Sequence, residues 1–218
     1  MAKKALIVWG GWDGHEPEGV SRLLGDSLKK RGVEVTISDT LDTFKALDLT
    51  QFDLIVPVWT MGKIEKEQLK PVLEAVREHG VGIGGVHGGM CDSFRNETEW
   101  QLMTGGQWVA HPGNDGVEYT VEMNPDEPDP ITEGVPTLQI KSEQYYMHID
   151  PAIRVLATTT FADGTVMPVV WTKHYGKGRV FYCSLGHHVD VIEPPVIQDM
   201  VTRGLLWAAH ELQVPETA

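Results

Sequence analysis

An apolar run followed directly by a histidine and two glycines is the stretch most informative about the fold: Val81-Gly82-Ile83-Gly84-Gly85-Val86-His87-Gly88-Gly89. The run is typical of a strand buried on both faces. The spacing of Gly85 and Gly89 around His87 matches a nucleophile elbow, a strained strand-to-helix turn that projects one side chain into a crevice. Here that side chain is an imidazole, which can bind a metal or move a proton but is a poor durable nucleophile. We therefore predict that His87 faces a binding crevice; the alternative is a histidine packed under a loop.

Strand and helix patterns alternate on both sides of this turn. Apolar runs predict strands, apolar residues at helical spacing predict helices, and Gly176-Lys177-Gly178 predicts a tight hairpin turn. The expected strands are residues 5–9, 33–38, 54–58, 81–86, 117–123, 138–142, 155–160, 166–172 and 179–184, and the expected helices are residues 18–30, 65–79, 93–103 and 194–210. This order predicts one α/β domain over residues 1–218, with a parallel central sheet and antiparallel additions in the second half.

Composition excludes several classes of protein. The 218 residues include 18 Lys and Arg against 31 Asp and Glu, a net charge of −13, which disfavours binding to nucleic acid and to anionic membranes. The two cysteines favour reduced thiols, and no apolar run reaches the length of a signal peptide or membrane span. We expect a soluble, cytoplasmic protein whose acidic segment from Asp126 to Glu133 is a solvated face. Exposed strands of the second half could support a homo-oligomer.

Several candidate binding segments follow predicted strands. The carboxyl ends of parallel strands form the binding crevice of such sheets, and the polar, glycine-rich or aromatic segments at these ends are residues 10–15, 59–62, 87–89 and 186–188. Two further segments, residues 105–112 and 142–146, lie between the halves. The glycine motifs for dinucleotides and phosphate loops are absent, so we expect no nucleotide cofactor.

The chain resembles the ThuA-like (trehalose utilisation) family, whose fold is that of class I glutamine amidotransferases and is flavodoxin-like. The resemblance extends over nearly the whole chain and rests on residues 85–87, 92–94, 99–100, 105–106, 111–112, 129–132, 142–145, 168–171, 176–182, 185–187 and 203–208. In an amidotransferase the elbow carries a cysteine, which His87 replaces here, and His187 resembles the partner histidine. Without that thiol no thioester can form, so glutaminase activity is not expected. The resemblance implies instead sugar catabolism, acting on 3-keto derivatives of glycosides.

Isomerisation or elimination of a keto-sugar begins with removal of a proton next to the carbonyl. That step needs a base and a group that stabilises the enediolate oxygen. We expect His111, Glu143 and His187 to hold a divalent metal, with His87 as a fourth ligand or as the base. Imidazole and carboxylate suit zinc, iron or manganese.

The remaining candidates are assigned by residue type. His15 and Tyr145 are expected in proton transfer or hydroxyl binding, and Trp12, Trp59 and Trp108 in stacking on a sugar ring, with His188 as a further substrate or supporting contact. Structural roles are the alternative for each. Two other functions stay open: a catalytically silent module that binds a sugar or a protein, and a cysteine hydrolase that uses Cys91.

Overall fold

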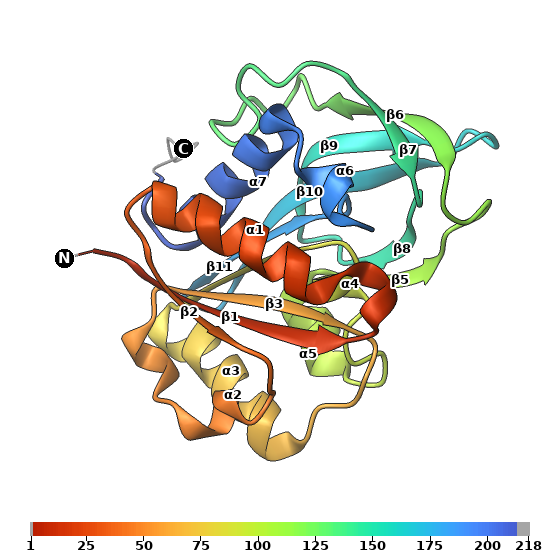
Figure 1. Ribbon diagram of the computed structural model, residues 1–218. Coiled ribbons are helices and arrows are strands. Elements are labelled where there is room, and N and C mark those ends of the chain that lie inside the picture. The colour runs from red at the N-terminus through yellow and green to blue at the C-terminus, as the bar shows by residue number, and fades with distance from the viewer. Residues whose placement is uncertain (1, 213–218) are drawn as a thin grey trace.

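A nine-stranded sheet forms the centre of the protein in the computed structural model, which describes residues 2–212. The strand order is β2-β1-β3-β4-β11-β10-β9-β6-β7, parallel from β2 to β11 and antiparallel from there on (Figure 1). The strands are β1 (Lys4–Gly11), β2 (Glu34–Ser38), β3 (Leu54–Thr60), β4 (Gly82–Val86), β6 (Val117–Met123), β7 (Leu138–Ser142), β9 (Arg154–Thr160), β10 (Val166–Tyr175) and β11 (Gly178–Cys183). The predicted parallel sheet with antiparallel additions is therefore confirmed.

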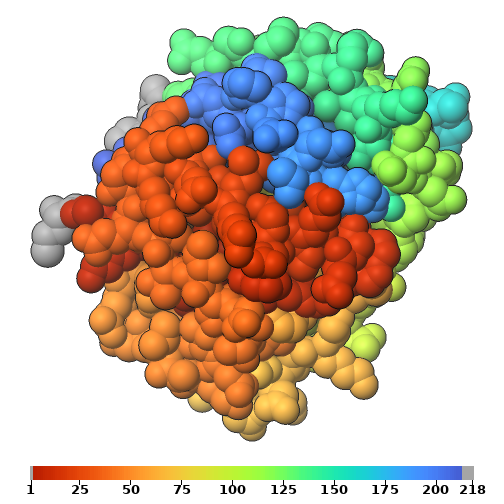
Figure 2. Space-filling model, in the orientation of Figure 1, coloured from red at the N-terminus to blue at the C-terminus, as the bar shows by residue number. Residues whose placement is uncertain are grey.

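Helices cover both faces of the parallel part of the sheet. On one face lie α1 (Pro17–Lys30), α6 (Val189–Ile192) and α7 (Pro195–Ala208), and on the other lie α2 (Thr43–Ala46), α3 (Lys66–His79) and α5 (Thr98–Thr104) (Figure 1). Figure 2 shows α1 and the C-terminal helices packed side by side across the front of the molecule. Each face thus buries its own apolar core against the sheet.

Two expected features of the middle of the chain differ in the structure. Residues 106–110 and 146–149 pair as a separate antiparallel ribbon, β5 (Gly106–Ala110) with β8 (Tyr146–Ile149), where the sequence predicted no strand. The helix expected over residues 93–103 is shorter in the structure: α5 begins only at Thr98, and an irregular segment over residues 92–97 separates it from the short helix α4 (Gly88–Cys91). The cause is a backbone link to the end of β3: Met61 N donates to Asp92 O and Phe94 N donates to Met61 O, and Phe94 has a positive φ of 49°.

The acidic segment from Asp126 to Glu133 also departs from the prediction. Residues 124–137 form no helix or strand, yet Asp129 is buried. Its carboxylate pairs with the guanidinium of Arg154 on β9, and it accepts a hydrogen bond from Ile131 N at 2.8 Å. The expectation of a fully solvated face is therefore wrong at Asp129, because an ion pair and a backbone donor compensate its burial.

The strand ends bring distant parts of the chain together. The 3₁₀ turn η1 (Asp13–His15) follows β1, Met61 follows β3, His87 follows β4 and His187 comes shortly after β11. Because these strands are parallel neighbours, their carboxyl ends meet at one edge of the sheet. The second 3₁₀ turn, η2 (Leu49–Gln51), lies at the opposite end, before β3. None of the helices within residues 2–212 is long and apolar enough to cross a membrane.

We predict that Gly204→Ala destabilises the protein by about 2 kcal/mol or more. A Cβ at Gly204 in α7 would lie 2.1 Å from the Phe181 ring, which is fully buried in β11, and overpacking of this kind costs about 1–3 kcal/mol. Gly25→Ala in α1 is the control, since its Cβ would meet only the ends of side chains, the nearest being Ile37 Cδ1 at 3.2 Å. Alanine is intrinsically better than glycine within a helix, so urea unfolding should leave Gly25→Ala unchanged or more stable. Equal stability of both variants would contradict this packing.

Candidate functional site

The turn after β4 has the strained backbone expected of an elbow. His87 adopts φ 48° and ψ −141°, a backbone conformation that residues other than glycine rarely adopt. The glycines around it allow close approach: a Cβ at Gly89 would lie 3.0 Å from Val58 Cα on β3, and one at Gly88 would lie 2.6 Å from His15 Cε1. The predicted strand-to-helix turn at His87 is therefore confirmed, and its glycines admit a second imidazole.

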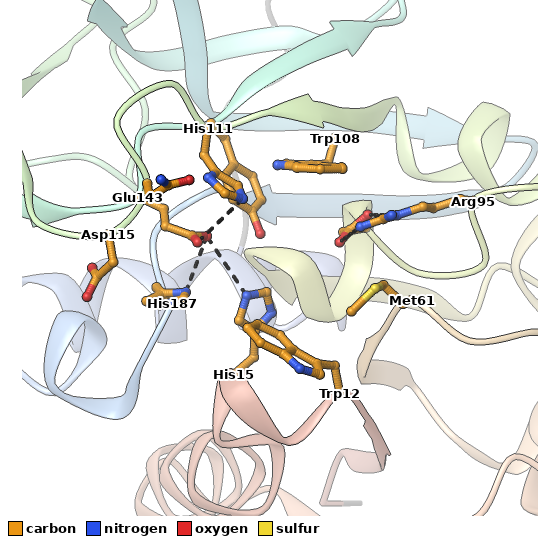
Figure 3. Close-up of a pocket in the computed structure, with 12 residues that line it drawn as sticks. Trp12, His15, Met61, Arg95, Trp108, His111, Asp115, Glu143 and His187 are labelled. Atoms are coloured by element: carbon orange, nitrogen blue, oxygen red, sulfur yellow. Dashed lines mark hydrogen bonds and ion pairs between the residues drawn. The ribbon is translucent and has the colours of Figure 1, made fainter.

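Glu143 lies at the centre of a cluster of histidines. Its Oε2 atom lies 3.1 Å from His87 Nε2, 3.2 Å from His187 Nδ1 and 3.9 Å from His15 Nε2. One ligand atom from each of these four residues lies within 4.8 Å of the other three, and all four residues are buried. His111 faces the other oxygen, with Nε2 at 3.6 Å from Oε1 (Figure 3).

The outer ring nitrogens of two histidines are held by hydrogen bonds. His87 Nδ1 lies 2.7 Å from the carbonyl oxygen of Ser184, and His15 Nδ1 lies 2.8 Å from Thr60 Oγ1. Since a carbonyl oxygen only accepts, His87 donates through Nδ1, and in its neutral form Nε2 carries a lone pair. That lone pair points at the carboxylate of Glu143.

His187 differs from these two histidines. Its Nδ1 approaches Glu143 without the alignment of a hydrogen bond and has no hydrogen-bond partner among the described residues. A buried, unpartnered nitrogen directed at a carboxylate is unusual in a folded protein. It is one of the four atoms that converge around Glu143 Oε2.

Burial sets the charge states within the cluster. It lowers the pKa of His15 to about 3, assisted by repulsion from His87 and His187, and it also lowers the pKa of His87. For Glu143, burial alone would raise the pKa, but the interactions with His187 and His87 outweigh it and hold the pKa below its usual value. The site therefore favours an ionised carboxylate at Glu143 beside neutral imidazoles at His15 and His87.

A cavity of about 320 Å³ opens onto this cluster. Its volume is at the lower end of the usual range for small-molecule sites. Trp12 and Trp108 lie at two sides of it, with His15, His111 and His187 between them (Figure 3). Trp12 is 47% exposed, so one aromatic face is available to a ligand.

One side of the cavity carries an ion pair that the sequence did not indicate. Arg95 donates to both carboxylate oxygens of Asp92, from Nε at 2.6 Å and from a terminal nitrogen at 2.8 Å, and its guanidinium lies 4.5 Å from the centre of the Trp108 ring. Met61, Asn114 and Asp115 complete the lining. The signal for Asp92 and Arg95 was their place five and eight residues after the elbow histidine, but the sequence predicted a helix from residue 93 onward.

The residues predicted from the sequence divide into two groups. The cavity is lined by Trp12, His15, Trp108, His111, Glu143, Tyr145 and His187. His87 was expected to face this crevice but is not among its lining residues, because its ring is fully buried in the cluster beside Glu143. Trp59 and His188 do not line it. The Trp59 ring packs over Gly10 and Gly62, and the His188 ring contacts that of His187 at a tilt of 49°, with ring centres 3.9 Å apart.

Tyr145 and Cys91 are both buried near the elbow but differ in access to the cavity. Tyr145 stacks on His87 with ring centres 3.9 Å apart, and burial raises the pKa of its hydroxyl well above 10. Cys91 is not among the residues that line the cavity, and burial also raises the pKa of its thiol. A thiol that stays protonated is a poor nucleophile, so this geometry disfavours the cysteine-hydrolase alternative.

Comparisons with known proteins agree with this fold. A sequence profile of the ThuA family, described as trehalose utilisation, matches residues 4–208. The chain belongs to the ThuA family. A search of curated protein sequences finds no match.

Solved structures share the fold at low sequence identity. A ThuA-like protein from Parabacteroides merdae aligns with a TM-score of 0.77 and 21% identity, over 100% of this chain and 93% of that one. One from Bacteroides uniformis gives 0.73 and 18%, over 95% and 91%. A protein described as part of a GMP synthase from Thermoplasma acidophilum gives 0.57 and 15%, over 96% and 95%. At these identities the likeness supports the amidotransferase-like fold alone.

We predict that the metal-free protein loses stability as the pH falls from about 6.5 towards 3. The pKa of His15 is about 3 in the fold against 6.5 in the unfolded chain, so the unfolded state binds the extra proton over this window. One such group gives a slope of up to about 1.4 kcal/mol per pH unit. Urea unfolding in excess chelator should show a flatter pH profile for His15→Gln than for the wild type.

The control for this measurement is His79→Gln, at the exposed end of α3. It should keep the wild-type slope. Parallel pH profiles for the wild type and His15→Gln would contradict the assignment of a buried, neutral imidazole to His15.

Proposed function

We propose that this protein is an enzyme of carbohydrate catabolism that removes a proton next to the carbonyl group of an oxidised sugar, such as a 3-keto-glycoside. A divalent metal ion held by His15, His87, Glu143 and His187 assists the reaction. The observation that carries the proposal is the contact between His87 Nε2 and Glu143 Oε2 at 3.1 Å, beside Nδ1 of His187, which lies 3.2 Å from the same oxygen without the geometry of a hydrogen bond.

The contact between His87 and Glu143 requires positive charge. The carbonyl oxygen of Ser184 accepts the Nδ1 proton of His87, so a neutral His87 turns a lone pair towards an ionised carboxylate. Two lone pairs at this separation repel each other unless a proton or a cation lies between them. Since burial disfavours the protonated form of His87, a cation satisfies both groups better.

The spacing of the four atoms also suits a metal ion. Tetrahedral ligands at about 2.0–2.1 Å from zinc lie roughly 3.3 Å from one another. Two of the contacts to Glu143 Oε2, at 3.1 and 3.2 Å, are close to this spacing. The outer hydrogen bonds of His87 and His15 are of the kind that fixes the tautomer and orientation of metal-bound imidazoles. Three imidazoles and one carboxylate favour zinc, iron or manganese over magnesium.

The residues around the cluster supply the proton transfers. We assign the base to His111, because its Nε2 faces Glu143 Oε1 from the cavity wall and its ring is 27% exposed. Its Nε2 would take the proton from the carbon next to the substrate carbonyl and later return it. Tyr145, whose raised pKa keeps its hydroxyl protonated, would donate a hydrogen bond to the substrate. A bound divalent ion supplies electrophilic stabilisation of the oxygen that gains charge.

These assignments exchange two roles expected from the sequence. His15 joins the metal-binding set because its Nε2 lies within the group of four ligand atoms. His111 moves from the metal-binding set to proton transfer, because it faces the other oxygen of Glu143. The two versions are separable by metal analysis of single variants.

We predict that the purified protein, reconstituted with zinc, manganese or iron, binds about one equivalent per chain. Glu143→Gln keeps the size of the side chain but removes its negative charge, and it should weaken metal binding by more than about a hundredfold, beyond the 10–100-fold typical of supporting residues. The matched control is Glu118→Gln on β6, an exposed residue. Metal content is measured by mass spectrometry after dialysis; equal content in wild type and Glu143→Gln would exclude this site.

We predict that His111→Asn retains the metal but slows proton exchange by about 10²–10⁴-fold, the usual contribution of a general base. The assay follows deuterium incorporation next to the carbonyl of methyl 3-keto-α-glucopyranoside in heavy water by NMR. Loss of metal from His111→Asn would instead return this residue to the metal-binding set. Bound metal without exchange above the uncatalysed rate in the wild type would favour a silent binding module.

A further inference from the structure

We propose that the Asp92–Arg95 pair determines which sugars enter the cavity, by binding the adjacent hydroxyl groups of an uncharged sugar and excluding phosphorylated or carboxylated ones. This inference rests on the proposed function, which it extends from a reaction to a substrate class. It follows from the geometry of the pair, the charges around the cavity and the way the pair is fixed.

The pair presents hydrogen-bonding groups but no net charge. Arg95 uses two of its five N–H groups on the two oxygens of Asp92, at 2.6 and 2.8 Å. The other N–H groups of Arg95, whose side chain is half-exposed, remain available, and both Arg95 and Asp92 line the cavity. A hydroxyl group can donate to the carboxylate while its neighbour accepts from the guanidinium, so the pair matches a pair of adjacent hydroxyls.

The cavity as a whole has no surplus of positive charge. The described residues that line it include three carboxylates, Asp92, Asp115 and Glu143, against one guanidinium, that of Arg95. A divalent ion at the cluster would balance the two remaining negative charges. A phosphate or carboxylate on the substrate would then enter a site whose charges are already compensated, and it would lose its hydration without gaining a partner.

The pair is also positioned rigidly for recognition. The side chain of Asp92 is 5% exposed and that of Arg95 is 43% exposed. The buried carboxylate therefore fixes the position of the more exposed guanidinium. The Trp108 ring supports the guanidinium at 4.5 Å, and the backbone bonds between Met61 and residues 92 and 94 hold the segment to the end of β3. Little side-chain freedom is left to lose when a ligand binds.

The test compares two non-reacting probes, methyl α-glucopyranoside and glucose 6-phosphate, by calorimetry on the metal-reconstituted protein. The wild type should bind the uncharged probe at least about tenfold more tightly. Arg95→Gln should weaken that binding by about tenfold or more, the usual effect of losing a hydrogen bond to a charged group. Asp92→Asn releases the charge of Arg95, so it should weaken binding of the uncharged probe and strengthen binding of the phosphorylated one.

The reversal by Asp92→Asn is the outcome that a purely structural role would not produce. A control is Arg22→Gln, which removes an exposed arginine paired with Glu18 on α1 and should leave both affinities unchanged. The proposal is overturned if Asp92→Asn weakens both probes equally, or if the wild type prefers the phosphorylated probe. If Asp92→Asn does not fold, unchanged affinities in Arg95→Gln overturn it.

Failure of the proposed function has a different signature. In that case neither probe binds, and the wild type does not accelerate deuterium exchange in the keto-glycoside. If deuterium exchange or sugar binding persists and does not depend on Asp92 or Arg95, the proposed reaction is retained. Only the role of these two residues in substrate selection is then excluded.

Discussion

The carboxylate of Glu143 is a buried negative charge, and the architecture around it is arranged to compensate that charge. The imidazoles of His15, His87 and His187 reach one of its oxygens and that of His111 reaches the other. His15, His87 and His187 come from separate segments that meet because parallel strands end at the same edge of the sheet. His111 instead follows β5 of the separate antiparallel ribbon. This convergence requires a strained backbone at His87, which has a positive φ, and a residue without a side chain at Gly88, where a Cβ would clash with His15. Removing Glu143 would leave the crowded imidazoles without a common partner.

The parallel half of the fold could be predicted from local sequence. Apolar runs marked the strands, and Gly80, which has a positive φ of 78°, ended α3 where expected. The ribbon of β5 and β8 was missed because its strands lie 35 residues or more apart in the sequence. Their pairing depends on contacts between distant parts of the chain, and the local spacing of apolar residues does not predict it.

The convergence of the candidate site residues was predictable where residue type and position along the strands agreed. A histidine at an elbow, or after the last strand of a parallel sheet, is informative because strand ends converge. Arg95 was not assigned to the site because a helix was predicted from residue 93 onward, whereas backbone hydrogen bonds between Met61 and residues 92 and 94 hold this segment against the end of β3. Trp59 was expected at the cavity for its position after β3, but the absent side chains of Gly10 and Gly62 give its ring a closer surface to pack on.

The presence of a histidine at the elbow, where amidotransferases carry a cysteine, changes the sensitivity of this position to oxidation. Thiolates at such turns are attacked by peroxide because they are ionised and accessible. Here the two thiols, Cys91 and Cys183, are buried, and burial raises the pKa of Cys183 to about 12. Imidazole has no comparable oxidation chemistry under mild conditions. The same sharp turn that makes thiol enzymes vulnerable to oxidative stress thus places in this protein a side chain that peroxide leaves intact.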